Sequence, residues 1–351
     1  MVKERIRYID IVESIAILLV IYCHYTMTIG ESVLANITLQ FTTTVAVPLF
    51  FMANGTLLFN SKFDIKKHMI RTLFFFISTI IWKAIYLLIM IAGRCFDFSL
   101  YSARDLFVYF GPASGADPYI PAVHFWFMYV LIAIYLVFPI FKYIYNKSLY
   151  WLLGILMVAL IFLVYRHEVT SNYSLPVLDE YASYLLFFLL GPLIHKAFYN
   201  KSFGTRSIIL LLVSITSFAV LVYQRKMYFG TLIGVWARLP LDYQRIATLV
   251  TAVALYAFFA SVNFKETKVS KYFEFVSIRT MNIYVVHGII GYLFEVYITP
   301  LLPYQDVFVH LARSILILGL SILVTEPLSY VPVVSKLLGF KKQTIKSKET
   351  V

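Results

Sequence analysis

Long apolar stretches, each close to the length of a membrane helix, alternate along the chain with short polar segments. A helix needs about 20 consecutive apolar residues to cross the hydrocarbon core of a bilayer. The pattern predicts about ten spans, with nine or eleven left open, at residues 8–29, 41–60, 72–93, 124–143, 150–166, 180–197, 207–223, 244–263, 279–298 and 308–328. No polar linker divides them, so we expect one integral-membrane domain over 1–335 and a basic tail over 336–351.

The composition agrees with an all-α, polytopic membrane protein. Apolar residues make up 61% of the chain, charged residues only 14%, and the mean hydropathy is +0.81. Soluble domains are about half apolar and about a quarter charged. The chain therefore belongs with multi-pass proteins of a cell membrane.

The distribution of Lys and Arg predicts the orientation of the spans. Most of the 30 basic residues fall in alternate connecting segments, beginning with the N-terminus. Cytoplasmic segments carry this excess, so both termini are expected in the cytoplasm. The net charge of +12 then reflects topology and needs no nucleic acid to explain it. The basic tail over 336–351 is expected to lie in water or to contact lipid headgroups.

The first span carries three ionisable residues on one helical face. At about 100° per residue, Asp10, Glu13 and His24 fall within roughly 60° of one another. Such groups are costly inside a bilayer and point to a functional site. A neutral imidazole at His24, about 25 Å along the helix from Tyr8, could act as a general base. A histidine that only forms an interhelical hydrogen bond is the alternative.

Five stretches, in order, resemble the integral-membrane acyltransferase family 3, whose members add acyl groups to surface glycans. They are Tyr8-Ile9-Asp10 through His24, Val47 through Gly55, His124-Phe125-Trp126-Phe127, Ile283 through His287, and Glu326-Pro327. The resemblance covers about residues 5–330 and is closest to the subgroup of the enterobacterial common antigen O-acetyltransferase.

This resemblance implies transfer of an acyl group, usually acetyl, from cytoplasmic acetyl-CoA to a hydroxyl of a cell-surface or lipid-linked glycan. His24 matches the expected catalytic histidine, with Asp10 as its polar partner in the site. Acetyl-CoA would serve as the acyl donor, with no metal involved, and a bacterial cytoplasmic membrane is the expected location.

Two positions depart from the family pattern. Glu13 stands where an arginine usually lies eleven residues before the histidine, and Asn54 stands where a serine is common. The first departure reverses a charge expected to help hold the donor or acceptor. Lys83, the most interior lysine, could neutralise Glu13 or Asp10, and pairing with Glu13 would restore the missing charge, so Lys83 and Glu13 are assigned to donor binding.

The remaining candidates are substrate-contacting and donor-attracting residues. His124 and Trp126 open the fourth span and His287 lies within the ninth, so these three, with Asn54, are assigned to substrate binding. An ordinary interfacial aromatic belt would also explain the first two. Lys67 and Arg71 could attract the phosphates of CoA, although the positive-inside pattern alone also predicts them.

Other functional classes have less support. The chain has no Gly-rich phosphate loop, metal-ligand cluster or G-x-S-x-G motif, which disfavours an ATPase, a metalloenzyme or a hydrolase. A glycan transporter or flippase, and a catalytically silent module of the same fold, stay open. The outer segments 94–123 and 224–243 could form walls of an acceptor site or act as simple connections.

Overall fold

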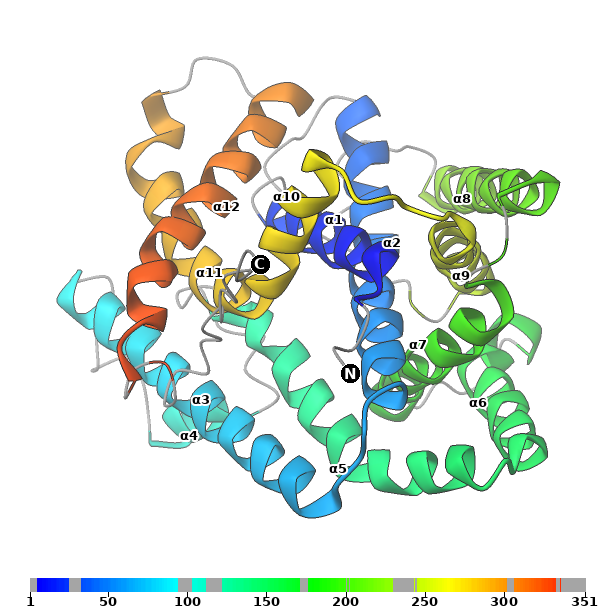
Figure 1. Ribbon diagram of the computed structural model, residues 1–351. Helices are drawn as coiled ribbons and strands as arrows, with labels where there is room; N and C mark the ends of the chain where they lie inside the picture. Colours follow the sequence, from blue (N-terminus) through cyan, green and yellow to red (C-terminus); the bar gives the residue numbers. More distant parts are fainter. Residues whose placement is uncertain are drawn as a thin grey trace, which may run out of the picture.

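Within the part of the chain that it describes, the computed structural model contains helices joined by turns and short irregular segments, and no strands (Figure 1). It describes residues 5–24, 33–93, 103–111, 122–170, 176–199, 201, 203–229, 243, 245–301, 306–332 and 335. Its α-helices are α1 Arg7–His24, α2 Val33–Phe59, α3 Ile65–Ala92, α4 Ala103–Phe110, α5 Trp126–Asn146, α6 Tyr150–Thr170, α7 Pro176–Phe198, α8 Thr205–Phe229, α9 Ile246–Ser261, α10 Lys268–Ile278, α11 Thr280–Tyr297 and α12 Val307–Ser329. The predicted all-α class is therefore confirmed.

Each of the ten predicted spans coincides with a helix. Among the described residues, seven helices are long and apolar enough to cross a membrane, namely α2, α3, α5, α7, α8, α11 and α12. The helices α6 and α9 contain shorter apolar stretches, and α1 carries Arg7, Asp10 and Glu13 within 18 residues. The protein is thus a multi-pass membrane protein, and membrane crossing by α1, α6 and α9 stays a prediction.

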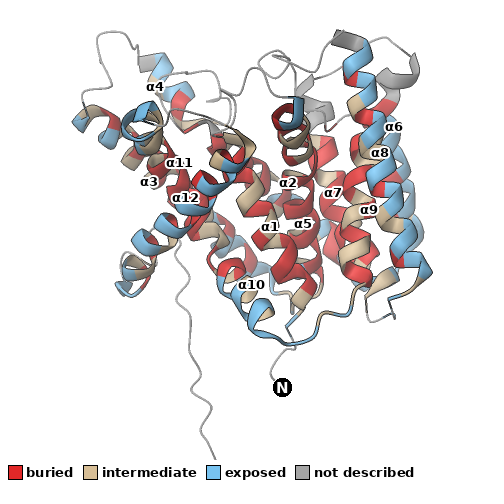
Figure 2. Cartoon of the chain, turned by 90° about the horizontal axis from the view of Figure 1, so that it is seen from above, coloured by how far each residue is buried: buried red, intermediate tan, exposed pale blue. Residues whose placement is uncertain are grey.

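Apolar side chains cover much of the outside of the bundle. Helix α8 exposes Ile208, Leu212 and Ile215, and α3 exposes Leu73 and Phe74. Buried residues instead concentrate along α1, α2, α5 and α7 in the middle of the molecule (Figure 2). Large apolar surfaces of this kind are typical of helices that face lipid.

Helices α2 and α7 pack closely because each presents a glycine to the other. A Cβ atom on Gly55 would lie 1.9 Å from the carbonyl oxygen of Phe188, and one on Gly191 would lie 2.0 Å from that of Met52. Small residues allow the backbones of membrane helices to approach in this way. The contact fixes α7 against the centre of the bundle.

Polar side chains mark the beginnings of several helices. Asp64 accepts a hydrogen bond from the amide of Lys67 at the start of α3, and Asp306 does the same for Val309 at α12. At α10, Thr267 and Ser270 form a reciprocal capping box. These contacts satisfy amides that lack an intrahelical partner, so the sequence itself sets where these helices begin.

The short helix α10 and Arg279, the residue that follows it, link α1 to α12 at one end of the bundle. Ser277 donates to Asp10 in the first turn of α1, while Arg279 forms two bonds of 2.6 and 2.8 Å to Glu326 near the end of α12. The beginning of α1 and the end of α12 therefore lie on the same side. The basic tail over 336–351 lies outside the described residues.

Candidate active site

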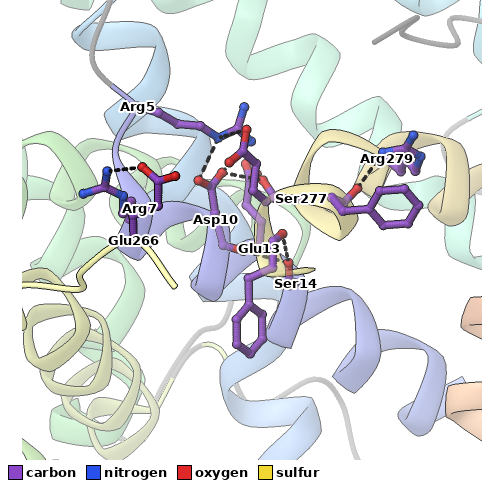
Figure 3. Close-up of polar contacts among 11 residues, drawn as sticks. Arg5, Arg7, Asp10, Glu13, Ser14, Glu266, Ser277 and Arg279 are labelled. Carbon is purple, nitrogen blue, oxygen red and sulfur yellow. Dashed lines mark hydrogen bonds and ion pairs between the residues drawn. The ribbon is translucent and has the colours of Figure 1, made fainter. Parts of the chain in front are cut away.

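The two acids of α1 belong to a polar cluster at the end of the bundle where α1 begins (Figure 3). Arg5 forms two hydrogen bonds of 2.8 and 2.7 Å to Asp10. The Ser277 hydroxyl lies 3.0 Å from the carboxylate of Asp10 and 2.6 Å from that of Glu13. The predicted common face of these acids is confirmed, and its neighbours are α10 and the N-terminal segment.

The expected ion pair between Lys83 and Glu13 is wrong. The Lys83 side chain is completely buried and donates to the backbone carbonyls of Tyr109 and Gly111, while Glu13 contacts Ser277. Lys83 therefore satisfies the carbonyl end of α4, which attracts a positive charge. The apolar pattern of the sequence could not predict these contacts of Lys83, because the carbonyls lie at the end of a short helix between two predicted spans.

Three predicted histidines, from three separate parts of the chain, meet near the other end of α1. The ring centroids of His24 and His287 lie 5.4 Å apart, those of His124 and His287 4.7 Å, and those of His24 and His124 5.9 Å. His124 and His287 are buried, and His24 is half-buried. We call His24, His124 and His287 the histidine cluster.

Backbone carbonyls set the proton positions on two of these rings. The Nδ1 atom of His24 lies 2.7 Å from the carbonyl oxygen of Val20, and that of His287 lies 2.6 Å from the carbonyl oxygen of Tyr284. A carbonyl can only accept, so Nδ1 is the protonated nitrogen in both neutral rings. The lone pair of each ring is then on Nε2, where a general base needs it.

The histidine cluster is packed against three residues that were not predicted as site residues, Tyr284, Tyr86 and Gly288. The hydroxyl of Tyr284 donates to the backbone carbonyl of His124, and the hydroxyl of Tyr86 lies 3.4 Å from Nε2 of the same histidine. A Cβ atom on Gly288 would come within 2.6 Å of the His124 ring. Tyr284 and Gly288 lie within three residues of His287, and this proximity offered a signal for both. Nothing around Tyr86 in the sequence distinguished it from other aromatic residues.

Three other predicted site residues, Asp10, Trp126 and Asn54, have contacts of a different kind. Asp10 is about 21 Å from His24 along α1, so it cannot orient that imidazole directly. Trp126 packs against Tyr184 of α7, with 5.2 Å between ring centroids. Asn54 accepts a 2.7 Å hydrogen bond from the Tyr135 hydroxyl. The structure thus brings His124 and His287 to His24, and it places Asp10 near the opposite end of α1.

A basic pocket of about 240 Å³ lies where α2 turns into α3. Its lining includes Lys62, Lys67, His68 and Arg71, with Asp64 as its acid. The two residues predicted to attract a phosphate-bearing donor therefore share one pocket, together with a third cation. Positive side chains grouped in this way suit phosphate oxygens.

Metal binding is not indicated by the geometry of the described residues. No three histidine, cysteine or carboxylate side chains among them are arranged to hold a metal ion.

Comparison with known families now places the chain. The Acyltransferase domain of acyltransferase family 3 matches residues 6–331. The chain belongs to this family. The match runs from α1 through α12 and confirms the resemblance carried by the five motifs, so the protein is a membrane acyltransferase by family. No curated protein sequence and no solved structure matches the chain. The closer resemblance to the enterobacterial common antigen O-acetyltransferase stays a prediction.

Proposed function

We propose that this family 3 acyltransferase transfers an acetyl group from cytoplasmic acetyl-CoA to a hydroxyl of a cell-surface or lipid-linked glycan, in a bacterial cytoplasmic membrane. The observation that carries the proposal is the histidine cluster, in which His24 presents a lone pair on Nε2 beside two further imidazoles. Acyl transfer to an alcohol requires a base at this point, because the hydroxyl must lose its proton.

The transfer begins with His24 as a neutral imidazole whose lone pair is on Nε2. Its Nε2 takes the proton of the acceptor hydroxyl while the hydroxyl oxygen attacks the thioester carbonyl. The new C–O bond forms, the C–S bond breaks, and the departing thiolate takes the proton from the imidazolium to become the free thiol. The buried surroundings of His124 and His287 limit access of water, which would otherwise compete as an acceptor.

The basic pocket supports a donor that carries its phosphates far from its thioester. Arg71 in the pocket and Tyr86 beside the histidine cluster are both on α3, 15 residues and about 22 Å apart along the helix. Acetyl-CoA has this form, with nucleotide phosphates at one end and the acyl group at the other. Lys62, Lys67 and Arg71 would hold the phosphates, and His24 would act at the acyl end.

Labelled acetyl-CoA tests the proposal directly. Membranes containing wild-type protein, or the His24→Ala or His24→Gln variant, are incubated with the donor, and label is followed into glycan and lipid-linked fractions. We expect label with wild-type protein and a loss of at least about a hundredfold in both variants. His195→Gln is the matched control, because His195 bonds Tyr8 at the far end of α1.

Two outcomes would reject the proposal. Label that persists in His24→Ala membranes would remove His24 from the reaction. Folded wild-type protein that labels no fraction would favour the transporter or the catalytically silent module instead, and glycan movement across vesicles without acetyl-CoA would identify the former.

A further inference from the structure

The hydroxyl of Tyr86 bridges two backbone groups of α11 that lie one helical turn apart. It donates to the carbonyl oxygen of Val285 at 3.1 Å and accepts from the amide of Ile289 at 3.2 Å. These two groups are the ordinary partners of one i to i+4 hydrogen bond in a helix. Tyr86 of α3 therefore joins the backbone ladder of α11, close to His287.

These two backbone contacts fix the direction of the hydrogen bond between the Tyr86 hydroxyl and His124. A carbonyl can only accept and an amide can only donate, so the single proton of Tyr86 goes to Val285. The hydroxyl oxygen then has one lone pair left for Nε2 of His124, which lies 3.4 Å away. Nε2 must be the donor in that contact, and the neutral His124 ring keeps its lone pair on Nδ1.

The packing around Tyr86 leaves little freedom for a different arrangement. Its side chain is 1% exposed, and its ring lies edge-on to Phe125 with 5.2 Å between centroids. A Cβ atom on Gly288 would come 2.5 Å from the Tyr86 hydroxyl and 2.6 Å from Cε1 of His124. The absence of a side chain at Gly288 is what lets both groups approach α11.

We propose that Tyr86 is a positioning residue that holds His124 in the tautomer protonated on Nε2, opposite to that of His24 and His287. His124 then offers its Nδ1 lone pair as a second neutral acceptor in the histidine cluster. Its place in acyl transfer rests on the proposed function, but the tautomer itself does not. Tyr86 acts through His124 and contacts no reacting atom.

The tautomer can be measured without any acyl transfer. Full-length protein with ¹⁵N-labelled histidine, in lipid nanodiscs, gives separate nitrogen signals for N–H and lone-pair positions, and His124→Gln identifies the His124 signals. We expect a protonated Nε2 on His124 in the wild type and a mixture of tautomers in Tyr86→Phe. Tyr109→Phe is the matched control, because its buried hydroxyl donates to the carbonyl of Lys83 and should leave His124 unchanged.

Either of two results would overturn the inference. One is a wild-type His124 protonated on Nδ1, a result that does not depend on whether Tyr86→Phe folds. The other is an unchanged His124 tautomer in Tyr86→Phe. With acetyl-CoA, Tyr86→Phe should lower kcat about tenfold and leave KM for the donor unchanged. Wild-type protein without activity but with the expected tautomer would reject the proposed function alone.

Discussion

At the residue scale, the histidine cluster depends on a single position that has no side chain. Gly288→Ala would place a methyl group 2.5 Å from the Tyr86 hydroxyl and 2.6 Å from the His124 ring, closer than real contacts allow. We expect at least tenfold slower acyl transfer and a lower melting temperature. Gly319→Ala in α12 is the control, because a Cβ there meets nothing within 4 Å and should keep or raise the melting temperature. Equal activity in the two variants would contradict the packing described here.

Ser277 is the residue through which the two carboxylates of α1 share one hydroxyl. Ser277→Ala would leave Asp10 with Arg5 but would remove the 2.6 Å contact of Glu13. We expect a loss of about 1–3 kcal/mol in the free energy of unfolding, measured by denaturant titration in detergent. Ser277→Thr keeps the hydroxyl and should recover most of the stability. A threonine variant no better than alanine would show that the contact contributes little.

Relations within one helix could be predicted from the sequence, whereas contacts between separate helices could not. The common face of Asp10 and Glu13 follows from helical periodicity and is confirmed. His24, His124 and His287 were each selected separately, but periodicity within a span cannot show that different spans meet. The pairing of Lys83 with Glu13 failed for the same reason, because Lys83 contacts Tyr109 of α4 and Glu13 contacts Ser277 of α10.

At the element scale, Lys83 stabilises the short helix α4 by contacting backbone carbonyls at the C-terminal end of that helix. Its ammonium satisfies the carbonyls of Tyr109 and Gly111 and lies about 5 Å from the rings of Tyr109 and Tyr129, at 5.1 and 5.0 Å. Lys83→Met keeps the apolar stem but leaves these carbonyls without the ammonium. We expect faster amide hydrogen exchange across 103–111, measured by mass spectrometry.

Lys142→Met is the matched control for that exchange experiment. Lys142 is also buried and donates to the carbonyl of Phe59, the last residue of α2. Its loss should raise exchange near residues 58–61 and leave 103–111 unchanged. Unchanged exchange over 103–111 in Lys83→Met would show that other contacts hold α4.

The whole molecule shows why apolar pattern predicted the long helices so well. In a bilayer every backbone polar group must be satisfied within the helix, so a long apolar stretch has few alternatives. The helices α4 and α10 were not predicted, since both are short and lie between spans. The position of α10 between the ends of α1 and α12 comes from Ser277 and Arg279, and no local pattern encodes such contacts.

Across the whole bundle, the basic pocket is separated from the histidine cluster along α3. The basic pocket and the histidine cluster lie at opposite ends of the stretch of α3 from Arg71 to Tyr86, so donor binding and chemistry should separate. Lys67→Gln and Arg71→Gln should each weaken acetyl-CoA binding about tenfold, as expected for loss of a charge-assisted hydrogen bond, and reduce its salt dependence. Activity at saturating donor should change little.

Isothermal titration at two salt concentrations measures both effects on detergent-solubilised protein. Lys201→Gln is the control, because Lys201 is an exposed cation outside the pocket lining. If the pocket binds the donor phosphates, only the pocket variants weaken binding, and the difference shrinks as salt rises. A uniform effect in all three variants would mean that the basic residues act on the donor through net charge and not through the pocket.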